Sequence, residues 1–216
     1  MRVAIVIPAF NEADSIGSVV ERVKPYGMPI VVDDGSTDET GRCAAEAGAT
    51  VMRQRSNNGY DAALARGFAE AEQGGADVIV TTDADGQLDT ACIPAMLQQF
   101  AELKIALVLG VRPAAARWSE ALFNRYARLR FGVSDILCGM KAFRVEAYCA
   151  HREKMAEPSV FTALALALLR NGASFASVPV SVHARTGRSR FGGAWRGNIR
   201  ILRALGSALA DDLVRR

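Results

Sequence analysis

Two carboxylates one residue apart, Asp83 and Asp85, stand between a strand-like apolar segment and Gly86. The end of a strand in an open α/β sheet is where ligands bind. Carboxylate oxygens there suit a hard divalent cation, which often shares its coordination with the phosphates of a substrate. Gln87 adds a third oxygen donor. The stretch therefore predicts a Mg²⁺ or Mn²⁺ site at Asp83, Asp85 and Gln87, and a surface turn rich in Asp and Gly is the alternative.

Polar or glycine-containing turns follow the other strand-like segments of the first half as well. Each of them alone is also explained as a turn or a helix cap. Together they predict one edge of a sheet that carries a nucleotide-binding crevice. An arginine at this edge is suited to bidentate binding of phosphate. The residues concerned are Pro8, Ala9 and Glu12, then Asp33 and Asp34, then Gly59, and finally Arg112.

The elements that would position these turns alternate between strand and helix. Continuously apolar strands that alternate with helices indicate a mostly parallel sheet covered on both faces, in a doubly wound, Rossmann-like α/β fold. No G-x-G-x-x-G follows the first strand, which argues against a dinucleotide-binding dehydrogenase. We expect strands at Val3–Ile7, Ile30–Val32, Ala49–Arg53, Val78–Thr82 and Ile105–Gly110, and helices at Ala13–Lys24, Thr37–Ala47, Gly59–Gln73 and Ala91–Leu103.

The second half is less regular, and no linker separates it from the first. We expect helices at Trp118–Arg130 and Ser159–Asn171, a strand at Phe175–Val182, and a final helix from about Ala194 to Asp212. The chain is therefore predicted to be a single catalytic domain. Residues 1–111 would form its nucleotide-binding half, residues 112–193 its acceptor half, and residues 194–216 a basic amphipathic helix.

Charge is divided unevenly along the 216 residues. Residues 1–111 hold 16 acidic and 8 basic side chains, whereas residues 112–216 hold 7 acidic and 18 basic ones. One half is suited to cations and the other to anions. No apolar run approaches the about 20 residues that span a bilayer. The four cysteines are widely spaced and follow no metal-binding pattern, so we expect a cytoplasmic protein with reduced thiols and no secretory leader.

The order of these segments resembles glycosyltransferase family 2 with the GT-A fold. Within that family the second half resembles the polyprenyl-phosphate glycosyltransferases, of which dolichol-phosphate mannosyltransferase is the type member. The resemblance extends from residue 3 to about residue 193. It is carried by residues 8–12, 32–38, 58–60, 83–87, 110–112, Asn124, 135–144, 178–180 and 185–192.

The resemblance implies roles for the matched positions. A nucleotide diphosphate sugar would be bound by Pro8, Ala9, Glu12, Asp33, Asp34, Gly59, Asp83, Ala84 and Asp85, with the base and ribose near Glu12 and Asp33. Asp83, Asp85 and Gln87 would hold the metal. Arg112, Arg117, Arg185, Ser189 and Arg190 would bind the acceptor phosphate and the donor diphosphate. The catalytic residues would be Asp83, Asp85, Arg112 and Arg185.

Two departures from the family pattern matter. Many relatives carry a carboxylate in the apolar helix before the Val-Pro strand, where this chain has Ala163, which leaves the sugar specificity or the local network open. Relatives also often carry transmembrane helices after the catalytic domain, and this sequence reaches Arg216 without one.

The acceptor is predicted from the inventory of bases. A phosphate oxygen is already anionic near neutral pH, whereas an alcohol needs a general base. The two histidines, His151 and His183, lie in no base motif. We therefore expect inverting transfer to polyprenyl phosphate. A soluble or saccharide acceptor remains an alternative, and so do a nucleotidyltransferase and a non-catalytic basic binding module. No nucleic acid partner is expected.

The final helix places Trp195, Ile199, Leu202, Leu205 and Leu209 on one face and Arg196, Arg200 and Arg203 on another. A basic amphipathic helix with a tryptophan can lie in a membrane interface. We expect peripheral contact with anionic lipid through residues 194–210, on the inner face of the membrane. A helix packed on the core with a solvated arginine face is the alternative.

Overall fold

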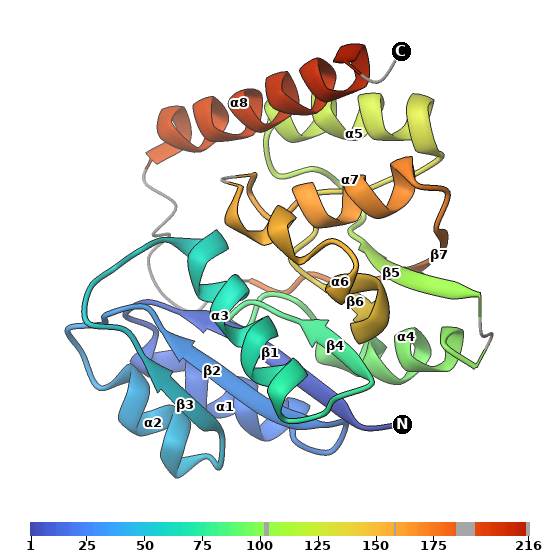
Figure 1. The fold of residues 1–216 in the computed structure, drawn as a ribbon. Coiled ribbons are helices and arrows are strands. Elements are labelled where there is room, and N and C mark those ends of the chain that lie inside the picture. Colours follow the sequence, from blue (N-terminus) through green and yellow to red (C-terminus); the bar gives the residue numbers. More distant parts are fainter. Residues whose placement is uncertain (102–103, 158, 185–192, 215–216) are drawn as a thin grey trace.

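The computed structural model describes residues 1–101, 104–157, 159–184 and 193–214. Seven strands form one sheet in the order β3-β2-β1-β4-β6-β5-β7 (Figure 1). The strands are β1 (Val3–Ala9), β2 (Met28–Asp33), β3 (Thr50–Arg53), β4 (Val78–Thr81), β5 (Ile105–Val111), β6 (Lys141–Arg144) and β7 (Ser174–Pro179). All of them run parallel except β6, which pairs antiparallel with both β4 and β5. The predicted mostly parallel α/β sheet is confirmed.

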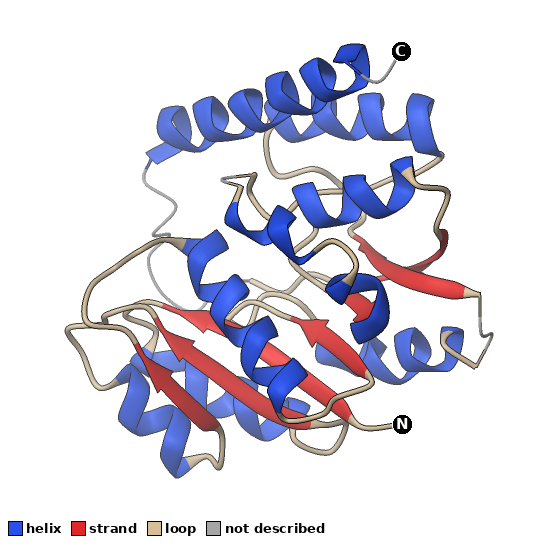
Figure 2. Cartoon of the chain, viewed as in Figure 1, coloured by secondary structure: helices blue, strands red, loops and turns tan. Residues whose placement is uncertain are grey.

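Helices cover both faces of the sheet (Figure 2). The α-helices are α1 (Ala13–Val23), α2 (Thr40–Glu46), α3 (Tyr60–Gln73), α4 (Ile93–Gln99), α5 (Trp118–Phe131), α6 (Val145–Cys149), α7 (Ala163–Arg170) and α8 (Gly193–Val214). Short 3₁₀ helices at Thr90–Cys92 and Arg152–Ala156 complete the described elements.

The two layers follow from the alternation of side chains along each strand. In β1, Ala4 and Val6 face the core that holds α3, α5, α6, α7 and α8, whereas Ile5 and Ile7 face the core that holds α1, α2 and α4. Because both faces of the central strands are buried, these strands are apolar at nearly every position.

Three sequence-based expectations were wrong in detail. No strand was predicted at Lys141–Arg144, because a four-residue segment with a charge at each end has no strand-like apolar pattern. The apolar helix begins at Ala163 and not at Ser159, since Val160 and Phe161 adopt left-handed backbone angles. The last strand ends at Pro179, and Val182 forms only an isolated bridge with Leu88.

Helix α8 is fixed to the body by Arg170 of α7. The Arg170 side chain is only 6% exposed, and its Nε lies 2.7 Å from Asp212 Oδ1. Its Nη2 donates to the Ala208 carbonyl at 2.7 Å, and Tyr126 of α5 donates to Asp212 at 2.8 Å. This cluster holds α8 against α5, beside which it lies in Figure 1.

Replacement of Arg170 by Met should lower the free energy of unfolding by about 3 kcal/mol, because Asp212 loses its closest buried partner. Urea denaturation followed by circular dichroism measures this loss. Arg128→Met, at an exposed position of α5, is the matched control and should change stability by less than about 0.5 kcal/mol. Equal stability of the two variants would contradict the role assigned to Arg170.

Candidate functional site

The carboxyl ends of β1, β2, β4 and β5 meet at one edge of the sheet, where an open pocket of about 460 Å³ lies. We call it the central pocket. Several elements of both halves of the chain line it. Its lining includes Pro8, Ala9, Glu12, Asp34, Gly59, Tyr60, Asp83, Ala84, Asp85, Gln87, Arg112, Arg117, Glu120, Gly139, Lys141, Val160, Phe161, Arg200 and Ile201.

The loops after β1 and β2 are tied together by short hydrogen bonds. Asn11, at φ 54°, accepts from the Thr37 amide at 2.7 Å, and the Glu12 amide donates to Thr40 Oγ1 at 2.7 Å. An asparagine tolerates this left-handed conformation better than most residues. The bonds hold Pro8, Ala9 and Glu12 at the edge of the pocket.

Asp34 is committed to the neighbouring loop. Its Oδ1 accepts from the Asn58 amide and its Oδ2 from the Gly59 amide, both at 2.8 Å. Gly59 has φ 94°, a backbone conformation in which a residue with a side chain would be strained. This conformation lets the backbone turn into α3. Asp34 therefore lines the pocket but also acts as the brace for the start of α3.

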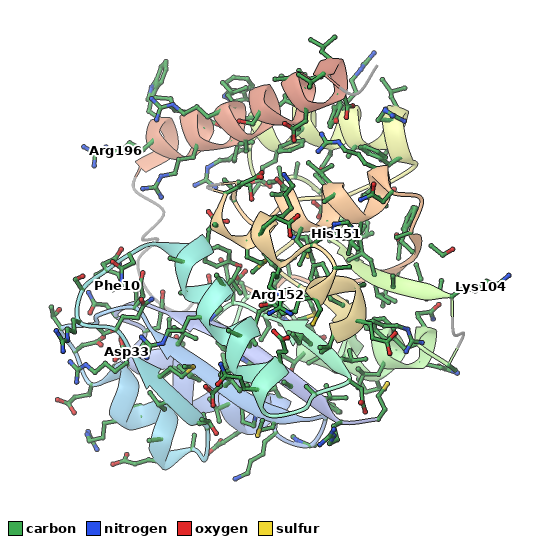
Figure 3. All side chains as sticks on the ribbon, viewed as in Figure 1. Phe10, Asp33, Lys104, His151, Arg152 and Arg196 are labelled. Atoms are coloured by element: carbon green, nitrogen blue, oxygen red, sulfur yellow. The ribbon has the colours of Figure 1, made fainter. Side chains whose placement is uncertain are left out.

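Asp33 lies beneath this loop and is not among the residues that line the central pocket. It is 1% exposed, and its Oδ1 accepts from the Ser36 amide at 2.9 Å. Among the described residues, its Oδ2 is the buried side-chain oxygen or nitrogen that lacks a hydrogen bond. Arg53 Nε stands 3.7 Å away. Figure 3 shows Asp33 and Phe10 on the same side of the molecule, at the loops that follow β2 and β1.

Asp83 and Asp85 both face the central pocket. Tyr60, the first residue of α3, donates its hydroxyl to Asp83 Oδ1 at 2.9 Å. Asp85 Oδ1 accepts from the Gln87 amide at 3.0 Å. Burial and the nearby charge of Asp85 raise the pKa of Asp83. A cation that neutralises the pair would offset both effects.

Gly139 is required by the position of Asp83. A Cβ at Gly139 would stand 2.5 Å from Asp83 Oδ2, closer than atoms can approach. The Gly139 carbonyl accepts from Thr81 Oγ1 at 2.7 Å, which fixes the loop before β6 against the end of β4. The carboxylate is thus held between Tyr60 and a backbone without a side chain.

The second half of the chain supplies the positively charged side chains that line the pocket. Arg112 follows β5, but its Nε and Nη2 bind the two oxygens of Asp135 at 2.7 and 2.9 Å. Nη2 also donates to Glu120 at 3.0 Å. Burial works to lower the pKa of Arg112, yet the bound Asp135 and the charge of Glu120 raise it overall. Nη1 makes no hydrogen bond to the described residues, and Arg112 lines the central pocket.

Lys141 is completely buried, although it lines the pocket. Its Nζ donates to the Cys138 carbonyl at 2.6 Å and lies 4.4 Å from the centre of the Phe161 ring. Burial lowers its pKa to about 8. Sequence reasoning gave no role to this residue, although a buried ionisable side chain with a shifted pKa in a pocket is the kind of residue that marks a site.

Arg200 corrects the prediction for the last helix. We expected it in a stripe with Arg196 and Arg203, and all three are exposed, but Arg200 also lines the central pocket, as does Ile201. Leu205, which we expected on one apolar face with Trp195, Ile199, Leu202 and Leu209, is buried in the core with Ile201, Ala204 and Ala208. The core-facing side of α8 is therefore turned relative to the predicted one.

Most of the predicted site residues are brought together. Pro8, Ala9, Glu12, Asp34, Gly59, Asp83, Ala84, Asp85, Gln87, Arg112 and Arg117 all line the one pocket. Arg185, Ser189 and Arg190 lie outside the described residues. Tyr60, Glu120, Lys141, Phe161 and Arg200 line the pocket too, and no role was predicted there for any of them.

The predicted metal site can be tested against its donors. Asp83, Asp85 and Gln87 offer the oxygen ligands that Mg²⁺ and Mn²⁺ prefer. Among the described residues, no three His, Cys, Asp or Glu side chains gather in a metal-binding group. The set therefore fits a cation that takes its remaining ligands from water and from a substrate's phosphates.

Known proteins of similar sequence include transferases named for undecaprenyl phosphate. The undecaprenyl-phosphate mannosyltransferase of Micrococcus luteus is 30% identical over 167 residues, which cover 68% of each chain. The undecaprenyl-phosphate 4-deoxy-4-formamido-L-arabinose transferase of Pseudomonas fluorescens is 33% identical over 204 residues. That match covers 84% of this chain but only 56% of the relative, so the chain spans little more than half of that protein.

Solved structures give the same fold. Glucosyl-3-phosphoglycerate synthase from Mycobacterium tuberculosis, in complex with Mn²⁺, UDP and glucosyl-3-phosphoglycerate, superposes with a TM-score of 0.71 at 22% identity. The match covers 95% of this chain and 80% of that one. The predicted GT-A fold is thereby confirmed.

The family model described as glycosyl transferase family 2 matches residues 4–149, about two thirds of the chain and all the strand ends that carry the carboxylates. Together with the relatives, this match confirms the resemblance seen in the sequence. The chain belongs to glycosyltransferase family 2 and is a glycosyltransferase.

Proposed function

We propose that the protein transfers a sugar from a nucleoside diphosphate to polyprenyl phosphate, with inversion at the anomeric carbon. The observation that carries this proposal is the division of charge across the central pocket. Asp83 and Asp85 face it from the end of β4, whereas Arg112, Arg117, Lys141 and Arg200 face it from the second half of the chain. Such a pocket is suited to a reaction in which a cation and two phosphorylated substrates meet.

The nucleotide would occupy the end of the pocket formed by the loops after β1 and β2. Available there are the backbone groups of Pro8 and Ala9 and the carboxylate of Glu12. Gly59 allows a ligand to approach the backbone closely. Asp33 Oδ2 accepts no hydrogen bond from the described residues and is paired only with Arg53, at 3.7 Å, so it is an acceptor suited to a base N–H once Arg53 moves. Asp34 would shape this end through its hold on Gly59.

Asp83, Asp85 and Gln87 would hold Mg²⁺ or Mn²⁺. The metal would supply positive charge beside the diphosphate as it becomes the leaving group. Tyr60 contributes by orienting Asp83 and by favouring its ionised form, since its hydrogen bond lowers the pKa that burial raises. The donors fit such a cation, as the oxygen set above indicates.

The bonding changes need no general base. An oxygen of the acceptor phosphate attacks the anomeric carbon, and the bond from that carbon to the β-phosphate oxygen breaks with its electron pair. The nucleoside diphosphate leaves, and attack from the opposite side inverts the centre. Arg112 Nη1, Arg117 and Arg200 would stabilise the phosphates, as preorganised cations do. Neither His151 nor His183 lines the pocket, in keeping with an acceptor that is already ionised.

A lipid acceptor also gives a role to the exposed apolar residues beside the pocket. Trp195, Ile199 and Leu209 of α8 are exposed, as are Trp118, Leu122 and Leu129 of α5. The two helices pack side by side, and arginines accompany these residues at 125, 128, 196 and 203. Figure 3 shows Arg196 pointing outward at the start of α8. We propose that this face rests on anionic lipid. None of the described helices is long and apolar enough to cross a bilayer.

The direct test is a screen of UDP- and GDP-sugars with Mn²⁺ or Mg²⁺ against polyprenyl phosphate and against saccharides and small phosphorylated acceptors. Release of nucleoside diphosphate with a lipid-linked sugar phosphate supports the proposal. Turnover on the other acceptors alone would favour a different acceptor class. Release of pyrophosphate would indicate a nucleotidyltransferase, and nucleic acid binding without turnover of any sugar donor would favour a basic binding module.

Asp85→Ala should reduce turnover by about a hundredfold or more while the protein stays folded, because the diphosphate loses the charge stabilisation that a bound metal provides. Initial rates of nucleoside diphosphate release measure the effect. Asp89→Ala removes a carboxylate from the same loop that does not line the pocket, and it should keep turnover near that of the wild type. Full activity of Asp85→Ala would refute the metal role.

Tyr60→Phe should weaken Mn²⁺ binding in the presence of nucleoside diphosphate by about tenfold, since Asp83 loses a hydrogen bond to its charged oxygen. Calorimetric titration with Mn²⁺ gives the affinity. Tyr148→Phe is the matched control, because the Tyr148 hydroxyl makes no hydrogen bond to the described residues. An unchanged affinity in Tyr60→Phe would show that the bond does not support the metal site.

The variant Trp195→Ser, Arg196→Glu, Arg203→Glu should lose co-sedimentation with phosphatidylglycerol vesicles, since both the apolar and the cationic contributions are removed. Arg200 stays unchanged because it lines the pocket. Arg22→Glu, Arg42→Glu reverses the charge of two arginines in α1 and α2 and should bind vesicles like the wild type. Retention of vesicle binding by the α8 variant would disprove the lipid-facing role of this helix.

A further inference from the structure

The backbone is strained at one place in the wall of the central pocket. Val160 and Phe161 have φ of 53° and 57°, and both line the pocket. A β-branched or aromatic residue rarely adopts this left-handed conformation, and two in succession are held only where surrounding contacts enforce it. We call this segment the Val160–Phe161 turn. Backbone strain of this kind clusters at active and ligand-binding sites, and here it lies in the wall of the pocket.

Asp61 holds the turn from the side of α3. Its Oδ1 accepts from the Phe161 amide at 2.6 Å, and its Oδ2 accepts from the Val160 amide at 3.3 Å. Successive amides of such a turn form a concave site for an anion, here filled by a side chain of the same protein. Asp61 itself does not line the pocket, so it acts on the pocket through the turn.

The other end of the turn is fixed by Ser159. Its Oγ accepts hydrogen bonds from the Thr162 and Ala163 amides at 3.2 and 3.0 Å. These two bonds satisfy backbone donors at the start of α7. The turn is thus braced by Asp61 on one side and by the beginning of α7 on the other. Asp61 thus brings a carboxylate to the segment directly before Ala163. Ala163 stands where the family pattern has a carboxylate and this sequence does not.

The turn positions an aromatic ring and, through it, a buried cation. The Phe161 ring packs edge to face against Phe68 and Phe143, with centroids 5.8 and 5.7 Å apart. Lys141 Nζ lies 4.4 Å from the centre of the same ring. Such a contact attracts an ammonium group to the face of the ring. Movement of the turn would therefore displace both Phe161 and Lys141 in the pocket.

The strand order places this wall relative to the nucleotide. From β2, which carries Asp33 and Asp34, the sheet continues through β1 to β4 and then to β6, which carries Lys141. The carboxylates after β4 thus lie between the nucleotide end of the pocket and the wall of Lys141 and Phe161. A nucleotide sugar is ordered as base, ribose, diphosphate and sugar. With the diphosphate at Asp83 and Asp85, the sugar reaches the wall.

We propose that Asp61 is a positioning residue that sets the sugar-binding wall of the pocket by holding the Val160–Phe161 turn. The inference rests on the proposed function, because the ligand is the hexose-like part of the donor. An aromatic ring beside an ammonium group suits a polyhydroxylated sugar, which offers both C–H faces and hydroxyl acceptors. Asp61 acts on the recognition of the sugar, whereas Tyr60, its neighbour in α3, acts on the carboxylates.

The experiment compares two ligands in the same variants. Affinity for UDP and GDP with Mn²⁺, and for UDP-glucose and GDP-mannose with Mn²⁺, is measured by calorimetry in the full chain. Asp61→Ala should bind the nucleoside diphosphate within about twofold of the wild type but the nucleotide sugar about tenfold more weakly. Its KM for the donor should rise by a similar factor.

Two further variants make the comparison specific. Asp14→Ala removes the carboxylate at the same position of α1, the second residue of the helix, and should match the wild type with both ligands. Asp61→Ala, Val160→Gly adds a glycine that adopts the left-handed conformation without a bracing carboxylate. This double variant should recover at least part of the affinity for the nucleotide sugar.

The outcomes separate the inference from the proposed function. If the wild type binds none of the nucleotides, the proposed function fails, and the inference fails with it. If the wild type binds them and Asp61→Ala loses both ligands equally, or neither, Asp61 does not position the sugar wall. If Asp61→Ala does not fold, Asp61→Asn keeps one acceptor oxygen. It should show a smaller loss for the nucleotide sugar alone, and unchanged binding in that variant overturns the inference.

Discussion

Hydrogen bonding of β6 to both β4 and β5 joins the two halves of the chain in one sheet. Because β6 runs antiparallel, its first residue, Lys141, lies beside Thr81 at the carboxyl end of β4. The loop before it packs Gly139 against Asp83. The acidic turns of the first half and the cations of the second half therefore meet at one edge. The arrangement of the site therefore depends on this single antiparallel strand.

The charged side chains at this edge differ in how far they are paired with groups of opposite charge. Arg112 is bound to Asp135 and Glu120, so much of its charge is compensated before a ligand arrives. Among the described residues, no carboxylate directly contacts Lys141, which is held by a carbonyl and an aromatic ring. Asp83 and Asp85 face the pocket opposite them. A ligand that carries both phosphate and a metal ion relieves the repulsion and desolvation that these groups endure, so the pocket is organised in advance for its occupant.

Much of the fold and part of the site could be predicted from the sequence. Each strand of the first half was found from its apolar run. Glu12, Asp34, Asp85 and Arg112 line one pocket as expected, because parallel strands end at one edge, whereas Asp33 lies beneath its loop. Lys141 could not be predicted, since a short antiparallel strand is defined by its partners and not by its own pattern. The Val160–Phe161 turn was also missed, because the apolar residues that follow suggest a helix and Asp61 lies about 100 residues away in sequence. The place of Arg200 in the pocket lining was missed because periodicity alone does not say which face of a helix meets the body.

The buried Lys141 has a consequence for protein engineering. A fully desolvated ammonium group with no bound carboxylate in the described part of the chain opposes folding, so an apolar residue of similar size would make the domain more stable. Selection for heat resistance alone would therefore favour loss of this lysine and would remove a cation from the pocket. A thermostable form that is to remain an enzyme should be sought with position 141 held constant, and its stability gained on the far side of the sheet.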